Sequence, residues 1–210
     1  MVIIIGNQKG GAGKSTLTLL LANYLALAKK CELTVMDMDY QQSLAQKYEK
    51  AKVLENDEPY QVIAAGLEHF PDMAEVLGQN KNHIILVDLP GKLDDDGLIP
   101  LFEAADLVLC PFAYDEFSYE STILFSVVLR KINPDVAIIY IPNRIKANVK
   151  YETQLEVNEQ LAHFGEISDK IPDRIDVQRT NTQQTQLSVY PVIVPVFSKI
   201  FEQYIKPNSL

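Results

Sequence analysis

The segment Asn7-Gln8-Lys9-Gly10-Gly11-Ala12-Gly13-Lys14-Ser15-Thr16 decides the fold of this 210-residue chain. It follows the short apolar run Val2–Ile5 and precedes a long apolar segment, Leu17–Ala28, that lacks glycine and proline. A strand, a glycine-rich turn and the start of a helix, in this order, are the context of a phosphate-binding loop. Backbone N–H groups of such a turn form an anion site together with the helix N-terminus. The sequence therefore predicts a loop that binds the phosphates of a nucleoside triphosphate.

Two side chains near the end of this segment carry the expected chemistry. The Lys14 ammonium group supplies a positive charge for the β- and γ-phosphates, and the Ser15 hydroxyl is an oxygen ligand for Mg²⁺. The other loop positions are expected to hold phosphate oxygens through the main chain: Gly10, Gly11, Ala12, Gly13 and Thr16. We therefore expect a triphosphate and Mg²⁺ to bind here together.

Lys9 is the unusual residue of the loop. The common pattern G-x-x-x-x-G-K-[ST] has glycine where this chain has Gln8, and a second lysine follows at once. Since one nucleotide does not need this second lysine, we expect Lys9 to reach a phosphate bound by another subunit, as an arginine finger supplied in trans does. The alternative, a solvated loop lysine, stays open at this point.

The loop and four further segments resemble the motifs of the ParA/MinD family of ATPases. Residues 7–16 look like the deviant Walker A loop of that family, whose signature residue is the early lysine. Asp37–Ser43 resembles the family's D-x-D-P-Q-x-S segment, and Ile84–Pro90 resembles its Walker B strand. Ile141–Arg144 and Ile171–Arg174 look like its two adenine-side loops. Several motifs in this order are far more specific than one glycine loop.

The resemblance implies a Mg²⁺-dependent ATPase that forms a homodimer with ATP bound. Transferred position by position, it assigns catalysis to Lys9, Lys14 and Asp39. The metal ligands that it implies are Ser15, Asp37 and Asp88. For the adenine side it implies Asn143, Arg144 and Pro172. ParA-like proteins coat DNA nonspecifically as ATP dimers, and a ParB-like or other adaptor protein stimulates their hydrolysis. We therefore expect a protein that partitions or positions plasmid or chromosomal DNA.

Carboxylates follow two of the apolar runs, at the strand ends where open α/β sheets bind ligands. Asp88 ends a buried run, which favours a role beside the Mg²⁺ hydration shell over capping of the next turn. Asp37 and Asp39 point to the same side if the segment is extended. For Asp39 we favour activation of the attacking water over a capping role. Tyr40 replaces the proline of the resembled family, which frees a backbone N–H and relaxes φ.

Asn143 follows an apolar run and a proline. Its amide offers a donor and an acceptor that match the N6 and N7 edge of adenine. The alternative is an ordinary turn asparagine. The resemblance favours base recognition, with Arg144 nearby and Pro172 contributing shape from the second loop.

Apolar runs alternate with helical patterns along the chain. Strands are predicted at Val2–Ile5, Leu33–Met36, Ile84–Val87, Leu107–Cys110 and Val136–Ile141, and helices at Lys14–Lys30, Ser118–Ile132, Tyr151–Phe164 and roughly 196–206. Short helices and one edge strand are expected within residues 45–82. This alternation predicts an α/β fold of the P-loop NTPase type, a mainly parallel twisted sheet with helices on both faces. The length suits a single ATPase domain, residues 1–210.

Composition favours a cytoplasmic protein. No apolar run has transmembrane length, no signal peptide is evident, and Cys31 and Cys110 lack metal-binding spacing. The net charge is −9, with 11 basic and 20 acidic residues in residues 1–143 and 8 of each in residues 144–210. This balance does not indicate a nucleic-acid binder, but a local patch is sufficient. Candidate DNA contacts, which would make the protein nucleoid-associated, are Lys146, Lys150, Lys170, Arg174, Arg179, Lys199 and Lys206.

The last helical segment leaves a second function open. Its apolar side resembles a MinD-type membrane-targeting helix, which would make the chain a membrane-associated positioning ATPase. Such helices carry a strongly basic polar face, whereas this one mixes Lys199 and Lys206 with Glu202. We therefore expect the helix to pack on the domain and membrane binding to be absent. The iron–sulfur reductase and biotin-synthesis ligase relatives fit poorly, because the paired cysteines and a carboxylating substrate site are missing.

Overall fold

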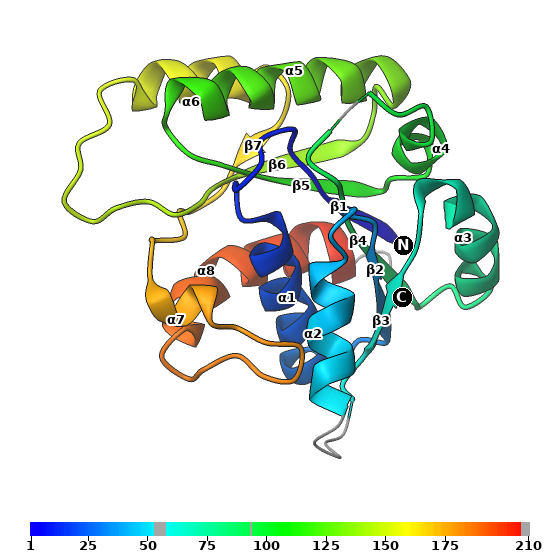
Figure 1. Cartoon of the computed structure of the whole chain (residues 1–210). Coiled ribbons are helices and arrows are strands. Elements are labelled where there is room, and N and C mark those ends of the chain that lie inside the picture. Colours follow the sequence, from blue (N-terminus) through cyan, green and yellow to red (C-terminus); the bar gives the residue numbers. More distant parts are fainter. Residues whose placement is uncertain (53–57, 93, 207–210) are drawn as a thin grey trace.

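The computed structural model describes residues 1–52, 58–92 and 94–206, which form a seven-stranded, entirely parallel sheet with helices on both faces (Figure 1). The strands are β1 Val2–Ile5, β2 Leu33–Asp37, β3 Gln61–Ala64, β4 Ile84–Asp88, β5 Leu107–Phe112, β6 Ala137–Pro142 and β7 Glu166–Ile167. Their order across the sheet is β3-β2-β4-β1-β5-β6-β7. The predicted fold class is therefore confirmed, and β1 lies in the middle of the sheet.

The helices form two layers around this sheet. The α-helices are α1 Lys14–Asn23, α2 Ser43–Lys52, α3 Phe70–Gly78, α4 Leu98–Glu103, α5 Glu116–Ile132, α6 Gln154–Ala162, α7 Ile175–Gln178 and α8 Tyr190–Ile200. A 3₁₀ turn at Leu67–His69 precedes α3, and π-helical turns at Tyr24–Ala28 and Phe201–Ile205 extend α1 and α8. Helices α1, α2, α7 and α8 cover one face, and α3 to α6 cover the other (Figure 1).

Each face of the sheet has its own apolar core, because side chains of successive strand residues point to opposite sides. Ile3 and Ile5 of β1 pack toward α1 and α8, whereas Ile4 packs toward α4 and α5. All three side chains are fully buried. Burial on both faces explains why the predicted strands read as continuous apolar runs without alternation.

The predicted strand starts and ends agree with the structure to within two residues, but three helices differ in extent. The helix predicted at Tyr151–Phe164 is shorter and covers only Gln154–Ala162. The first predicted helix is α-helical only to Asn23 and then continues as a π-helical turn. The last helix begins at Tyr190, several residues earlier than predicted, with Pro191 in its first turn and Pro195 inside it. Proline in the first turn of a helix costs no hydrogen bond, so Pro191 is compatible with this earlier start.

Helix α8 packs on the domain, as expected. Ile193, Phe197 and Ile200 are at most 2% exposed and belong to the core shared with α1. The polar side of the following turn is paired with acidic groups: Lys206 contacts Glu202 at 2.9 Å. None of the described helices is long and apolar enough to cross a membrane.

Candidate nucleotide-binding site

The glycine-rich loop joins the central strand β1 to α1 and turns sharply at two glycines. Gly11 and Gly13 have φ angles of +77° and +90°, which L-residues rarely adopt. A Cβ atom on Gly13 would also lie 2.3 Å from Asn143 Nδ2. Backbone geometry and close packing therefore both require glycine at position 13, immediately before the first residue of α1.

Asn7 fixes the start of the loop, a role that the sequence analysis missed. Its Nδ2 donates to the carbonyl of Pro111 at 2.9 Å and to Thr122 Oγ1 at 2.8 Å. Its Oδ1 accepts a hydrogen bond from the Lys9 N–H at 3.0 Å. The side chain is 1% exposed, so it anchors the loop to β5 and α5 from inside. The available signal was an amide residue directly after a buried strand.

A cavity of about 380 Å³ lies over the loop, and Lys14, Ser15, Thr16, Asp39 and Gly91 line it. The Lys14 side chain is 7% exposed, and this burial lowers its pKa. The carboxylates of Asp88 and Asp39 oppose that shift. The cavity thus places a cation between carboxylates at the N-terminus of a helix, an arrangement suited to a polyphosphate with a bound metal ion.

The Asp88 carboxylate accepts hydrogen bonds from two hydroxyl groups of α1. Ser15 Oγ donates to its Oδ2 at 2.6 Å, and Thr18 Oγ1 donates to its Oδ1 at 3.1 Å. Burial, which dominates, raises the pKa of the Asp88 carboxyl to about 7. Ser15 and Asp88 are both oxygen donors, and Mg²⁺ at phosphate sites uses one or two such protein ligands. The pair therefore fits Mg²⁺ when a triphosphate supplies further oxygens.

Asp37 is placed differently from the metal role that the resemblance implies. Its Oδ2 accepts the N–H groups of Leu44 at 2.9 Å and Ala45 at 3.0 Å, so it caps the N-terminus of α2. The side chain is fully buried, and this burial raises its pKa despite the amide bonds. This geometry favours the capping role. Among the described residues, no cluster of three or more His, Cys, Asp or Glu side chains could hold a metal ion.

Asp39 stands at the wall of the phosphate cavity on the loop between β2 and α2. Its Oδ1 accepts the Gln41 N–H at 2.9 Å, which holds the carboxylate in place. The next residue, Tyr40, is 70% exposed, and its hydroxyl donates to Asp95 Oδ2 at 3.3 Å. The tyrosine that replaces the expected proline thus links this loop to the loop that follows β4.

Lys9 does not point into the cavity that Lys14 lines. Its Nζ lies 5.3 Å from the centre of the Phe117 ring on α5, and it lines a separate cavity of about 230 Å³. The Phe117 side chain is 69% exposed. A cation–π contact therefore holds the ammonium group at the surface of the molecule, outside the lining of the phosphate cavity.

On the other side of the loop, Asn143 and Arg144 hold the phosphate loop by its carbonyl groups. Asn143 Nδ2 donates to the Ala12 carbonyl at 2.8 Å, and Arg144 Nη1 donates to the Gly11 carbonyl at 3.1 Å. Arg144 has a φ of +58°, a strained value for this residue type. The Asn143 donor that we expected to face a base is thus engaged with the loop.

The second base-side loop lies beside the first. The Ile145 N–H donates to the Ile171 carbonyl at 3.1 Å, and Asp173 N–H donates back to the Ile145 carbonyl at 3.0 Å. Together the two loops enclose a cavity of about 250 Å³ that adjoins the phosphate cavity through Gly13, Thr16 and Arg144; Asn143, Pro172 and Arg174 also line it. The structure therefore brings the sequence-predicted residues of both loops together around one compartment.

The sequence of this chain matches a known protein family. Residues 3–187 match the family described as the CobQ/CobB/MinD/ParA nucleotide binding domain. The chain belongs to this family. No curated protein matches it at a significant level. The match to the CobQ/CobB/MinD/ParA family confirms the family resemblance drawn from the motifs.

Three solved structures have a similar fold. A Borrelia burgdorferi B31 protein described as a plasmid partition protein, bound to AMPPNP, is 23% identical over 94% of this chain and 98% of that chain, with a TM-score of 0.69. Aquifex aeolicus MinD is 21% identical over 96% and 97%, with a TM-score of 0.73. The ATP complex of Cyanothece McdA is 17% identical over 96% and 95%, with a TM-score of 0.69. At these identities the likeness shows a common fold.

Proposed function

We propose that this chain is a ParA-like ATPase that dimerises on ATP, binds DNA nonspecifically and hydrolyses ATP when a ParB-like or other adaptor protein stimulates it. The observation that supports this most is the divergence of the two loop lysines. Lys14 is buried in the phosphate cavity, whereas Lys9 lies on Phe117 at the surface of the protomer. A surface cation on the phosphate loop is suited to a triphosphate held by a second copy.

In this proposal the residues around the phosphate cavity have different roles in binding and hydrolysing ATP. Lys14 and the loop amides bind the β- and γ-phosphates, and Ser15 with Asp88 holds Mg²⁺, which would neutralise charge on the phosphates. Asp39 orients and activates the attacking water, while Asp37 keeps that loop in position by capping α2. Asn143 and Pro172 bound the base compartment.

The cationic surface suggested for DNA is smaller than the sequence indicated. Three of the candidate residues are paired with carboxylates: Arg174 with Asp176, Lys199 with Asp169 and Lys206 with Glu202. Within the described part of the chain, no ion pair involves the other candidates: Lys146, Lys150, Lys170 and Arg179. Because these four are available for phosphate contacts, they are our proposed DNA residues.

The buried apolar side of α8 argues against the alternative of a MinD-type membrane helix. A membrane-targeting helix needs that side free to enter lipid, and here Ile193, Phe197 and Ile200 form part of the core. Partition of DNA therefore remains the better-supported use of the ATPase cycle.

Replacing Lys9 with alanine is expected to keep the protein monomeric. Gel filtration with Mg·ATP should move the wild-type chain to the dimer position, and Lys9→Ala should elute as a monomer with ATP and with ADP, since the cation that crosses to the partner's phosphates is gone. Lys131→Ala, an exposed lysine in the last turn of α5, is the control and should dimerise normally. ATP-dependent dimerisation of Lys9→Ala would exclude the cross-subunit role.

Replacing Asp39 with alanine is expected to trap the dimer. ATP still binds, because Lys14 and the loop are intact, but turnover should fall about 100-fold when the base that activates water is lost. Gel filtration with ATP should then show a dimer that persists for hours, and DNA at low salt should bind this dimer and not the ADP form. Asp39→Ala with wild-type turnover would assign the water to another group.

A further inference from the structure

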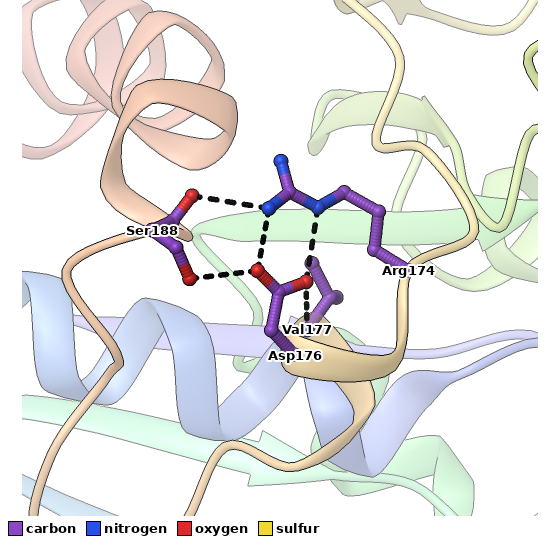
Figure 2. Close-up of polar contacts among 4 residues, drawn as sticks. All are labelled: Arg174, Asp176, Val177 and Ser188. Atoms are coloured by element: carbon purple, nitrogen blue, oxygen red, sulfur yellow. Dashed lines mark hydrogen bonds and ion pairs between the residues drawn. The ribbon is translucent and has the colours of Figure 1, made fainter.

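Arg174, which precedes α7 in the second base-side loop, has an unusually well-fixed side chain (Figure 2). Its Nε donates to Asp176 Oδ1 at 2.9 Å, and its Nη2 donates to the other carboxylate oxygen, Oδ2. Ser188 closes the arrangement, because its Oγ donates to Asp176 Oδ2 at 2.7 Å and its carbonyl lies 3.4 Å from Arg174 Nη2. A guanidinium group held by one carboxylate through two parallel hydrogen bonds, from Nε and Nη2, has a fixed plane.

The remaining edge of this guanidinium group is free. Figure 2 shows the third nitrogen of Arg174 pointing away from both Asp176 and Ser188. Among the described residues, no hydrogen bond uses Nη1. The bonds from Arg174 and Ser188 also keep the pKa of the Asp176 carboxyl below its usual range, so it accepts these bonds as a carboxylate at neutral pH. The result is a planar cation with two unused N–H donors.

This cation stands at the base compartment. Arg174 lines the cavity of about 250 Å³ together with Pro172 and Val177, opposite Gly13 and Thr16 at the start of α1. The cavity adjoins the phosphate site, so a nucleotide whose triphosphate lies on the glycine loop extends its base toward it. A guanidinium plane stacks well on a purine ring, and its free N–H groups can donate to ring nitrogen acceptors.

We propose that Arg174 is an affinity-determining residue for the purine base, and that Asp176 and Ser188 are positioning residues that fix the plane of its guanidinium group. This inference rests on the proposed binding of ATP. Because the plane is fixed before the nucleotide arrives, little side-chain entropy is lost on binding. The base contact of this chain then comes largely from the second loop, while Asn143 is engaged with the phosphate loop.

The competing explanation is purely structural. The same bonds tie Ser188, in the segment before α8, to α7, and the cluster would then only stabilise the fold. The two explanations differ in what they predict for a ligand without a base. A structural role affects every ligand of the site alike, whereas a base contact affects only ligands that carry the base.

The test compares Mg·AMPPNP with Mg·tripolyphosphate, which has the phosphates but no base, by calorimetry on the full chain. Arg174→Ala should weaken AMPPNP binding about tenfold, the effect of losing one stacked or hydrogen-bonded base contact. Tripolyphosphate binding should stay unchanged. Asp176→Asn should reproduce part of the AMPPNP loss, and Arg174→Lys should not restore affinity, because ammonium lacks the plane. Lys131→Ala, which removes an exposed cation in the last turn of α5 that does not line the cavity, is the control and should bind both ligands normally.

Equal losses for both ligands in Arg174→Ala, or no loss for either, would overturn the proposal. A variant that simply misfolds would also lose tripolyphosphate binding, so thermal melting without ligand is measured alongside and must match the wild type. Failure of the proposed function looks different: the wild-type chain, and not only the variants, would then bind neither AMPPNP nor tripolyphosphate. Lys14→Ala should abolish binding of both ligands if the phosphate site is as described.

Discussion

Asp88→Asn is expected to lower ATP turnover about 1,000-fold and, at the same time, to stabilise the nucleotide-free protein. The first effect follows from loss of a charged Mg²⁺ partner, since metal stabilisation of the transferring phosphate is worth several kcal/mol. The second follows from burial, which raises the pKa of this carboxyl from 3.8 to about 7. The asparagine amide can still pair with both hydroxyl groups that Ser15 and Thr18 direct at this position.

The stability effect has a defined pH dependence. A carboxyl whose pKa is raised on folding contributes most to stability below its unfolded pKa, and this contribution is lost as the pH rises through the folded pKa. The wild-type protein should therefore lose stability between pH 4 and about pH 7, by up to about 4 kcal/mol. In urea unfolding, Asp88→Asn should show a clearly smaller loss, with Asp37 still contributing because burial also raises its pKa, whereas the exposed Asp135→Asn should lose stability as the wild type does. An asparagine variant less stable than wild type at pH 8 would contradict this account.

Phe197→Ala is expected to destabilise the protein by about 3 to 5 kcal/mol, because removing a fully buried ring leaves a cavity between α8 and α1. The ring lies 5.7 Å from the centre of Tyr24, whose packing is lost with it. Chemical denaturation measures the effect. Val194→Ala, on the more exposed side of the same helix, should cost less than about 1 kcal/mol.

The same variant separates the two functions considered for this helix. If α8 left the domain to enter lipid, its apolar side would contribute little to folding, and Phe197→Ala would be nearly neutral in denaturation. Vesicle binding with ATP would then fall in this variant. We expect the reverse: a large loss of stability and no vesicle binding by the wild-type chain.

The fold was predictable because its strands are buried on both faces. Five apolar runs predict the five inner strands of the sheet, and the glycine loop indicates which of them leads into the phosphate-binding loop. Strand β7, with only Glu166 and Ile167, was not predicted, since two residues give no periodicity. The predicted start of α8 was too late, because we began the helix after Pro195, although Pro191 is compatible with a first helical turn and Pro195 lies inside the helix.

The candidate site was predictable as a set of positions, less so as a set of contacts. The motifs suggest that Ser15 and Asp88 share a ligand, and the structure places Ser15 Oγ 2.6 Å from Asp88 Oδ2. The sequence could not show that the Asp37 carboxylate accepts hydrogen bonds from the backbone amides of α2, because this depends on where that helix begins in space. The pairing of Arg174 with Asp176 and Ser188 likewise depends on a loop that returns to α7.

The position of β1 in the middle of the sheet affects how the protein unfolds on heating. Amides in a strand flanked by β4 on one side and β5 on the other exchange with deuterium only when the whole sheet opens. The glycine-rich loop follows directly after this strand. It should therefore be among the last segments to unfold on heating. Strands at the edges of the sheet can open locally while the proposed nucleotide site stays intact. Affinity for the nucleotide should be lost in one step, together with cooperative unfolding.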